Sequence, residues 1–170
     1  MISYAEQWRI LAKAREEVPV DVEGLPERLG IRYHKANLAK GISGMLERMG
    51  DTFLITVAAN DPLTRQRFTL AHELGHYMLH RKLIGAGLDD DRAYRSTEGG
   101  KYHNTFIGPK QETDANRFAA NMLMPRELVQ AKWEARNWDK SPDTVRQMAE
   151  LFGVSKPSMT IRLGLPYTPS

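Results

Sequence analysis

Residues 72–76 of this 170-residue chain read His-Glu-Leu-Gly-His, and this short run constrains the fold more than any other part of the sequence. On an α-helix, side chains four positions apart project from nearly the same side, about 40° apart. His72 and His76 can therefore grip one metal ion, with Glu73 near enough to reach a water molecule on it. The surrounding residues are mostly apolar, so we expect a buried helix. Two histidines and a glutamate buried together without a metal would be costly unless otherwise paired.

The residue types narrow the choice of metal. The chain has no cysteine, so disulfides and thiolate sites are excluded, and any metal must be held by histidine and carboxylate. This donor set suits one zinc ion, with manganese as an alternative. Zinc lowers the pKa of a bound water to about 7, and Glu73 can then accept the proton as a general base.

A third ligand is needed, because a catalytic zinc ion takes three protein ligands and keeps one position open. Glu112 is the best candidate, since it begins a second strongly patterned helix at 110–124. Asn116 lies one turn further and can accept a hydrogen bond from the free ring N–H of a ligand histidine. Asp114 is the rival ligand, although it points to a different side of this helix. The alternative for Glu112 is a purely electrostatic role at the helix N-terminus.

The two segments together are recognisable. The stretches RFTLAHELGHYMLH and ETDANRFAANMLMP resemble the ImmA/IrrE family of metallopeptidases, and the match covers most of the chain. The resemblance implies a gluzincin-type zincin, in which an active-site helix lies against a small sheet. It also implies His72, His76 and Glu112 as zinc ligands and Glu73 as the catalytic base of a metallo-endopeptidase.

The substrate is implied by the resemblance alone. The family cleaves helix-turn-helix repressors, which releases genes for mobile-element excision or a DNA-damage response. We therefore expect a protein partner, either such a repressor or an antitoxin. The alternative is a regulatory module that binds this partner without cleaving it.

The order of the predicted elements indicates an α+β fold. We expect helices at 4–17, 21–29, 62–81, 110–124, 126–137, 143–152 and 156–163, and strands at 31–34, 42–47 and 52–58. Asp61 is expected to cap the metal-site helix, with Pro62 at its first position. The result is a small zincin-like domain whose active-site helix packs on a short, mainly antiparallel sheet. Residues 1–140 form this domain, and residues 141–170 are a helical, helix-turn-helix-like extension of it.

The C-terminal helices also allow contact with nucleic acid. Ala149, Gly153 and Met159 have the spacing of a helix-turn-helix unit, and Lys156 and Arg162 are candidates for phosphate contacts. However, the net charge of +3 is too small to require a nucleic-acid partner. Two packed helices suffice to explain the pattern, so DNA contact and repressor docking stay alternatives.

Three further residues are weaker candidates for the site. His80 lies one turn beyond His76 and either makes an outer hydrogen bond or is a partly buried structural histidine. Tyr102 and His103 fall in a long loop, 84–108, and either can donate to the oxyanion that peptide hydrolysis generates. Loop surface is the simpler interpretation of both.

The sequence contains no evident targeting or membrane segment. The first 17 residues carry charges throughout and lack the apolar core of a signal peptide. No apolar run approaches the roughly 20 residues that span a bilayer. We therefore expect a cytoplasmic protein without a membrane partner.

Overall fold

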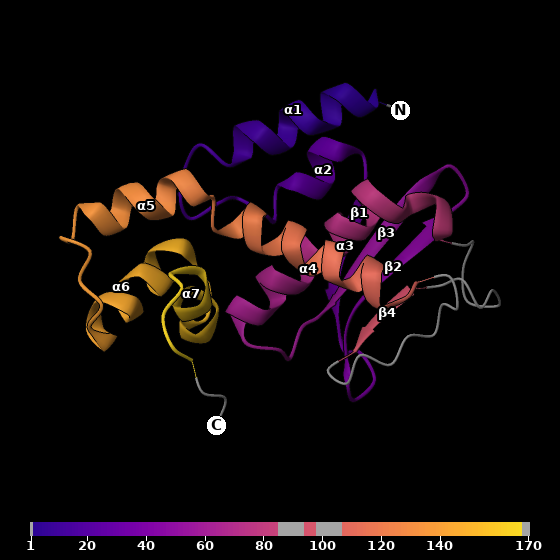
Figure 1. Ribbon diagram of the computed structural model, residues 1–170. Helices are drawn as coiled ribbons and strands as arrows, with labels where there is room; N and C mark the ends of the chain where they lie inside the picture. The colour runs from indigo at the N-terminus through magenta and orange to yellow at the C-terminus, as the bar shows by residue number, and fades with distance from the viewer. Residues whose placement is uncertain (1, 85–93, 98–106, 168–170) are drawn as a thin grey trace.

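The chain folds into a small sheet and a set of helices (Figure 1). The computed structural model describes residues 2–84, 94–97 and 107–167. The elements are α1 (Tyr4–Ala14), α2 (Leu25–Leu29), β1 (Arg32–Ala36), β2 (Ile42–Met49), β3 (Thr52–Ala58), α3 (Leu63–His80), the 3-10 turn η1 (Arg81–Leu83), β4 (Tyr94–Thr97), α4 (Pro109–Leu123), α5 (Arg126–Glu134), α6 (Pro142–Phe152) and α7 (Lys156–Arg162). This α+β architecture confirms the predicted fold class.

The sheet has the strand order β1-β3-β2-β4. Strand β3 pairs parallel with β1 and antiparallel with β2, and β2 pairs antiparallel with β4. The sheet is thus mainly antiparallel, as predicted. The strand expected at 52–58 is found with those bounds, because its β-branched and apolar residues suit an interior strand. We expected residues 84–108 to form a loop, but Tyr94–Thr97 form strand β4. This strand was not predicted because its pairing partner, β2, is distant in sequence.

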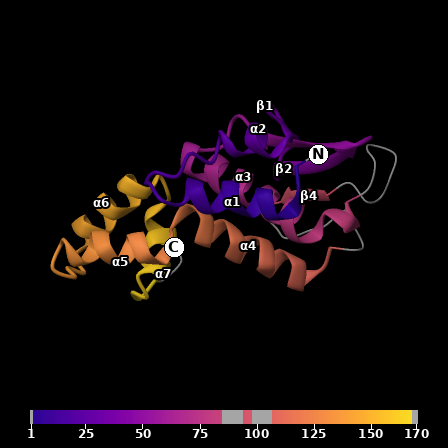
Figure 2. The same cartoon turned by 90° about the horizontal axis from the view of Figure 1, so that it is seen from above.

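Helix α3 lies at the centre of the fold and packs against both the sheet and α4. Figure 2 shows α4 running alongside α3, with α1 beside them. Gly75 allows this close approach, because a Cβ atom there would lie 3.1 Å from Phe118 Cδ1 and 3.2 Å from Ala115 Cα. The side chains of α3 are buried from Thr69 to Met78, so the helix carries the predicted motif into the interior.

The predicted start of α3 is wrong by one residue. Pro62 has an extended ψ of 147° and is the N-cap residue, so the first helical residue is Leu63. No side chain caps this end. Asp61 instead forms an ion pair with Arg65 at 3.3 Å, and Gln66 Nε2 donates to the Asp61 carbonyl at 2.7 Å. These contacts draw Asp61 away from the capping position.

The helices α6 and α7 form a hairpin joined at Gly153, whose φ of 64° is left-handed. Arg67 of α3 ties this hairpin to the rest of the fold: its Nε donates to the Gly153 carbonyl at 3.1 Å. The same guanidinium donates to the Val20 carbonyl at 2.8 Å and pairs with Glu23 at 2.9 Å. One cluster of buried side chains includes residues from α3, α6 and α7. We therefore propose that residues 141–170 extend the domain formed by residues 1–140.

Replacing Gly153 with Ala should destabilise the fold more than the same change at Gly30. Both glycines are left-handed, with φ of 64° and 71°, so each substitution costs roughly 1–2 kcal/mol of backbone strain. A Cβ at Gly30 meets nothing within 4 Å, whereas one at Gly153 would lie 2.9 Å from Arg67 Nε. Displacing that charged hydrogen bond should cost about 1.5–3 kcal/mol more. Urea unfolding of both variants measures the difference, and equal losses would contradict the role of Arg67.

None of the helices among the described residues is both long and apolar enough to cross a bilayer.

Candidate metal centre

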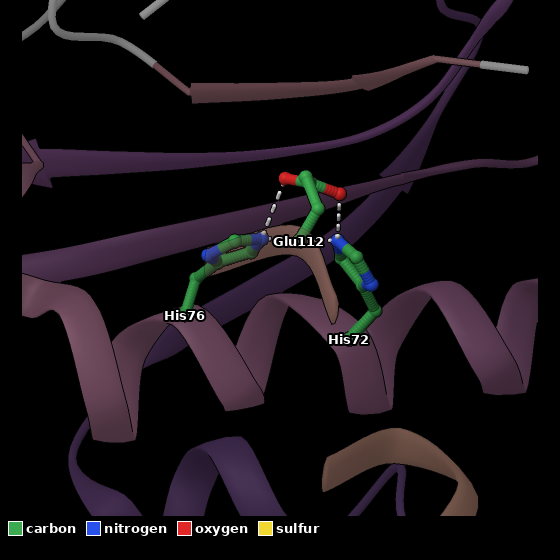
Figure 3. Close-up of side chains that lie close together, drawn as sticks. All are labelled: His72, His76 and Glu112. Carbon is green, nitrogen blue, oxygen red and sulfur yellow. Dashed lines mark hydrogen bonds and ion pairs between the residues drawn. The ribbon is translucent and has the colours of Figure 1, made fainter. Parts of the chain in front are cut away.

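Two imidazoles from α3 and one carboxylate from α4 meet at a single point (Figure 3). The Nε2 atoms of His72 and His76 lie 3.0 Å apart. Glu112 Oε2 lies 3.3 Å from His72 Nε2, and Glu112 Oε1 lies 3.1 Å from His76 Nε2. Ligands at about 2.0–2.1 Å from a tetrahedral zinc ion lie roughly 3.3–3.4 Å from one another. The spacing of the three side chains therefore fits one small cation.

The local sequence explains why these side chains meet. The two histidines are one helical turn apart on α3, so their rings share a face. Helix α4 begins at Pro109 after the N-cap Gly108, whose N–H donates to the Gln111 side chain at 3.1 Å. This start places Glu112 in the first turn of α4. The close packing at Gly75 then brings that turn against α3.

The outer ring nitrogen of each histidine also has a partner. His72 Nδ1 donates to Asn116 Oδ1 at 2.9 Å, because an amide oxygen only accepts. In the tautomer with its hydrogen on Nδ1, His72 presents a lone pair at Nε2. His76 Nδ1 lies 3.1 Å from His80 Nδ1. His80 Nε2 in turn lies 4.0 Å from Asp114 Oδ2, so Asp114 sits beside the outer histidine and not in the central group.

Burial sets the protonation of His76. The side chain is fully buried, and this burial lowers its pKa to about 4, against the opposing effect of Glu112. The ring is therefore neutral at physiological pH. Two imidazole nitrogens and a carboxylate directed at one point are the donor types that zinc accepts. The chemistry of the donor set thus agrees with its spacing: both fit a divalent metal ion.

Glu73 lies beside this group in an unusual environment. It is fully buried, and neither carboxylate oxygen has a hydrogen-bond partner among the described residues. Burial raises its pKa well above the ordinary value of 4.5, and the charge of Glu112 raises it further. A raised pKa brings a carboxyl group closer to the operating pH, where a general base accepts and then returns a proton most effectively.

Gly44 of β2 makes room for Glu73, and sequence reasoning did not single it out. A Cβ atom at Gly44 would overlap Thr69 Cγ2 and lie 3.0 Å from Glu73 Oε1. Any larger residue would therefore displace the buried carboxylate. A lone glycine inside a strand pattern is a recognised sign of close approach, so the signal was present in the sequence.

The remaining sequence candidates do not join the centre among the described residues. Tyr102 and His103 lie outside the part of the chain that the structure describes. Arg162, a candidate for phosphate contact, instead donates from Nη2 to the Met124 carbonyl at 2.6 Å. Lys156 is exposed at the start of α7.

Comparisons with known proteins agree with the architecture. Residues 26–164 match the family model of the IrrE N-terminal-like domain, peptidase M78. Among solved structures, a transcriptional regulator from Mycobacterium tuberculosis is similar, with 22% sequence identity and a TM-score of 0.57. That match covers 98% of this chain and 47% of the regulator, so this chain spans about half of that protein. Such a distant likeness shows the fold alone. A comparison with curated proteins gave no match.

Proposed function

Because the chain belongs to the peptidase M78 family of IrrE N-terminal-like domains, we propose that it is a metal-dependent endopeptidase acting on a regulatory protein. The proposal is carried by one observation: His72, His76 and Glu112 bring three ligand atoms within 4.8 Å of one another. In this proposal, these three residues hold the ion and Glu73 is the catalytic base.

The two histidines would bind through Nε2, and Glu112 would offset part of the positive charge. A zinc ion, or manganese in its place, supplies Lewis-acid activation of water and of the scissile carbonyl when it is bound. Asn116 and His80 orient the imidazoles through their Nδ1 atoms. Tyr102 and His103 stay candidates for donating to the oxyanion.

Glu73 moves the proton. One of its carboxylate oxygens accepts a proton as water attacks the scissile carbonyl, and the same oxygen returns it to the amine leaving group. The raised pKa of Glu73 supports this role, because the protonated carboxyl must persist between the two transfers. The burial of Glu73 serves the same end, because it is the main cause of the raised pKa.

A helix-turn-helix repressor or an antitoxin is the substrate that we propose. The family assignment supports a regulatory target, and the similar solved structure is described as a transcriptional regulator. Cleavage would derepress the genes of a mobile element, a toxin–antitoxin pair or a stress response. Such a partner works on DNA, which also favours the cytoplasm as the compartment.

The test is to incubate the metal-loaded chain with any helix-turn-helix protein found to be encoded in a neighbouring reading frame. Mass spectrometry should find two fragments of that partner. A chelator should abolish the cleavage, and fresh metal should restore it. A partner that stays whole while forming a stable complex would instead favour a regulatory binding module.

Replacing Asn116 with Ala should weaken metal binding by roughly 10–100-fold, the usual effect of losing an outer hydrogen bond to a ligand histidine. Without Asn116 Oδ1, the His72 ring loses the contact that holds its Nε2 lone pair toward the ion. Competition with a fluorescent zinc chelator measures the affinity. Asn121→Ala, an exposed amide on the same helix, is the matched control and should change nothing. Equal affinities for the two variants would remove Asn116 from the site.

A further inference from the structure

A second site lies in the helical half of the chain, away from the metal centre. Figure 1 shows α5, α6 and α7 at the opposite end of the molecule from the sheet. A pocket of about 190 Å³ opens between α5 and the end of α7, and its lining includes Arg126, Trp133, Trp138 and Arg162. Small-molecule sites usually occupy about 300–1,000 Å³. This pocket therefore suits one or two side chains of another protein better than a whole small ligand.

Its aromatic wall is held in place by the backbone. The Trp133 and Trp138 rings pack edge to face at 5.3 Å, and Trp133 Nε1 donates to the Asp139 carbonyl at 2.8 Å. Asn137 and Trp138 are both left-handed, with φ of 53° and 55°, which is uncommon for residues other than glycine. This backbone presents the Trp138 indole to solvent, where 45% of the residue is exposed.

The other wall has an excess of positive charge. No described carboxylate forms an ion pair with Arg126 or Arg162, and Arg162 Nε is buried without a hydrogen-bond partner in that part of the chain. Burial lowers the pKa of Arg162, and the charges of Arg126 and Arg15 lower it further. Glu127 is the acidic group that opposes them. An additional carboxylate would therefore be stabilised here.

We propose that this pocket docks an acidic segment of a protein partner, with a carboxylate at Arg126 and Arg162 and an adjacent apolar side chain against the two tryptophans. Arginine and tryptophan are among the residue types enriched at the positions that dominate binding energy in protein interfaces. The proposal deepens the proposed function, on which it rests for the partner's identity as a protein. It places part of substrate recognition far from the bond that is cut.

The experiment measures binding apart from cleavage. The probe is a fluorescein-labelled peptide of alternating Glu and Leu, and its counterpart has Lys in place of Glu. Anisotropy is recorded with the full chain carrying Glu73→Gln, which protects the probe from hydrolysis. The acidic peptide should bind, and the basic peptide should not.

Variants then locate the contact. Arg126→Glu should weaken binding by roughly tenfold or more, because a repelling charge faces the carboxylate. Trp138→Ala should weaken it by roughly fivefold. Lys132→Glu changes the charge of the same helix equally at an exposed position outside the pocket lining, and should alter binding less than about twofold. Circular dichroism checks that each variant is folded.

Several results would overturn the proposal. Equal weakening by Lys132→Glu and Arg126→Glu would show that binding depends on the overall charge of the chain and not on a contact at Arg126. An unchanged affinity in Trp138→Ala would remove the aromatic wall from the contact, and absence of binding would dismiss the site. Tighter binding of an oligothymidylate, with the same dependence on Arg126, would assign the pocket to nucleic acid. Peptide binding in a chain that cleaves no partner would keep the docking site while rejecting the peptidase.

Discussion

Replacing Glu73 with Gln should lower the rate of partner cleavage by roughly 10²–10⁴-fold, the usual contribution of a general base. Glutamine has nearly the same shape but cannot take a proton from the attacking water. Metal affinity should change little, because Glu73 is not among the three grouped ligand side chains. Cleavage rates and zinc titration calorimetry on the same preparations separate the two effects.

Glu134→Gln is the control for this change, since Glu134 is exposed near the end of α5, away from the metal centre. Its activity should equal that of the unmodified chain. Full activity in Glu73→Gln would rule out Glu73 as the base. Simultaneous loss of metal and activity would give Glu73 a structural role instead.

The same variant should also have a stability signature. The pKa of Glu73 is higher in the folded chain than its ordinary value of 4.5, so the folded state binds more protons than the unfolded state above that pH. Ionisation of the carboxyl group therefore costs no stability below about pH 4.5, and the fold loses stability as the pH rises from there toward the raised pKa. Glutamine does not titrate. In urea unfolding with a chelator present, the stability advantage of Glu73→Gln over the unmodified chain should be absent below about pH 4.5 and grow as the pH rises above it.

Local periodicity explains what could be predicted of the fold. Strand β3 and the spacing of His72 and His76 depend on residues close in sequence, so the pattern of side chains was sufficient. Strand β4 was missed because its hydrogen bonds are made with β2, about fifty residues away. The parallel pairing of β1 with β3 is likewise a long-range choice that periodicity does not encode.

The candidate site, too, could be predicted from the sequence only where it depends on residues close together in the chain. Glu112 and Asn116 lie one turn apart on α4, so their shared face follows from the helix period. Their approach to α3 depends on the missing side chain at Gly75, and the burial of Glu73 depends on Gly44. These two glycines act between elements that are far apart in the chain. Their importance emerges only once the helices and the sheet are packed.

Replacing Glu112 with Ala should weaken metal binding by more than about 100-fold, beyond the range for losing an outer hydrogen bond. The change removes the only carboxylate from the group of three ligands and leaves two imidazoles. Such a pair holds zinc weakly, because catalytic sites use three protein ligands. Chelator competition gives the affinity, and the cleavage rate should fall with the loss of bound metal.

Asp114→Ala is the decisive comparison, because Asp114 is the rival acidic residue in the same turn of α4. Its carboxylate lies 4.0 Å from His80 Nε2, so its loss should weaken metal binding no more than an outer contact does, by roughly tenfold. The reverse ranking would assign the third ligand to Asp114. Glu112 would then not be the carboxylate that binds the ion. The effect of Glu112 on the pKa of Glu73 would still hold. The two substitutions therefore test the ligand set independently of the base.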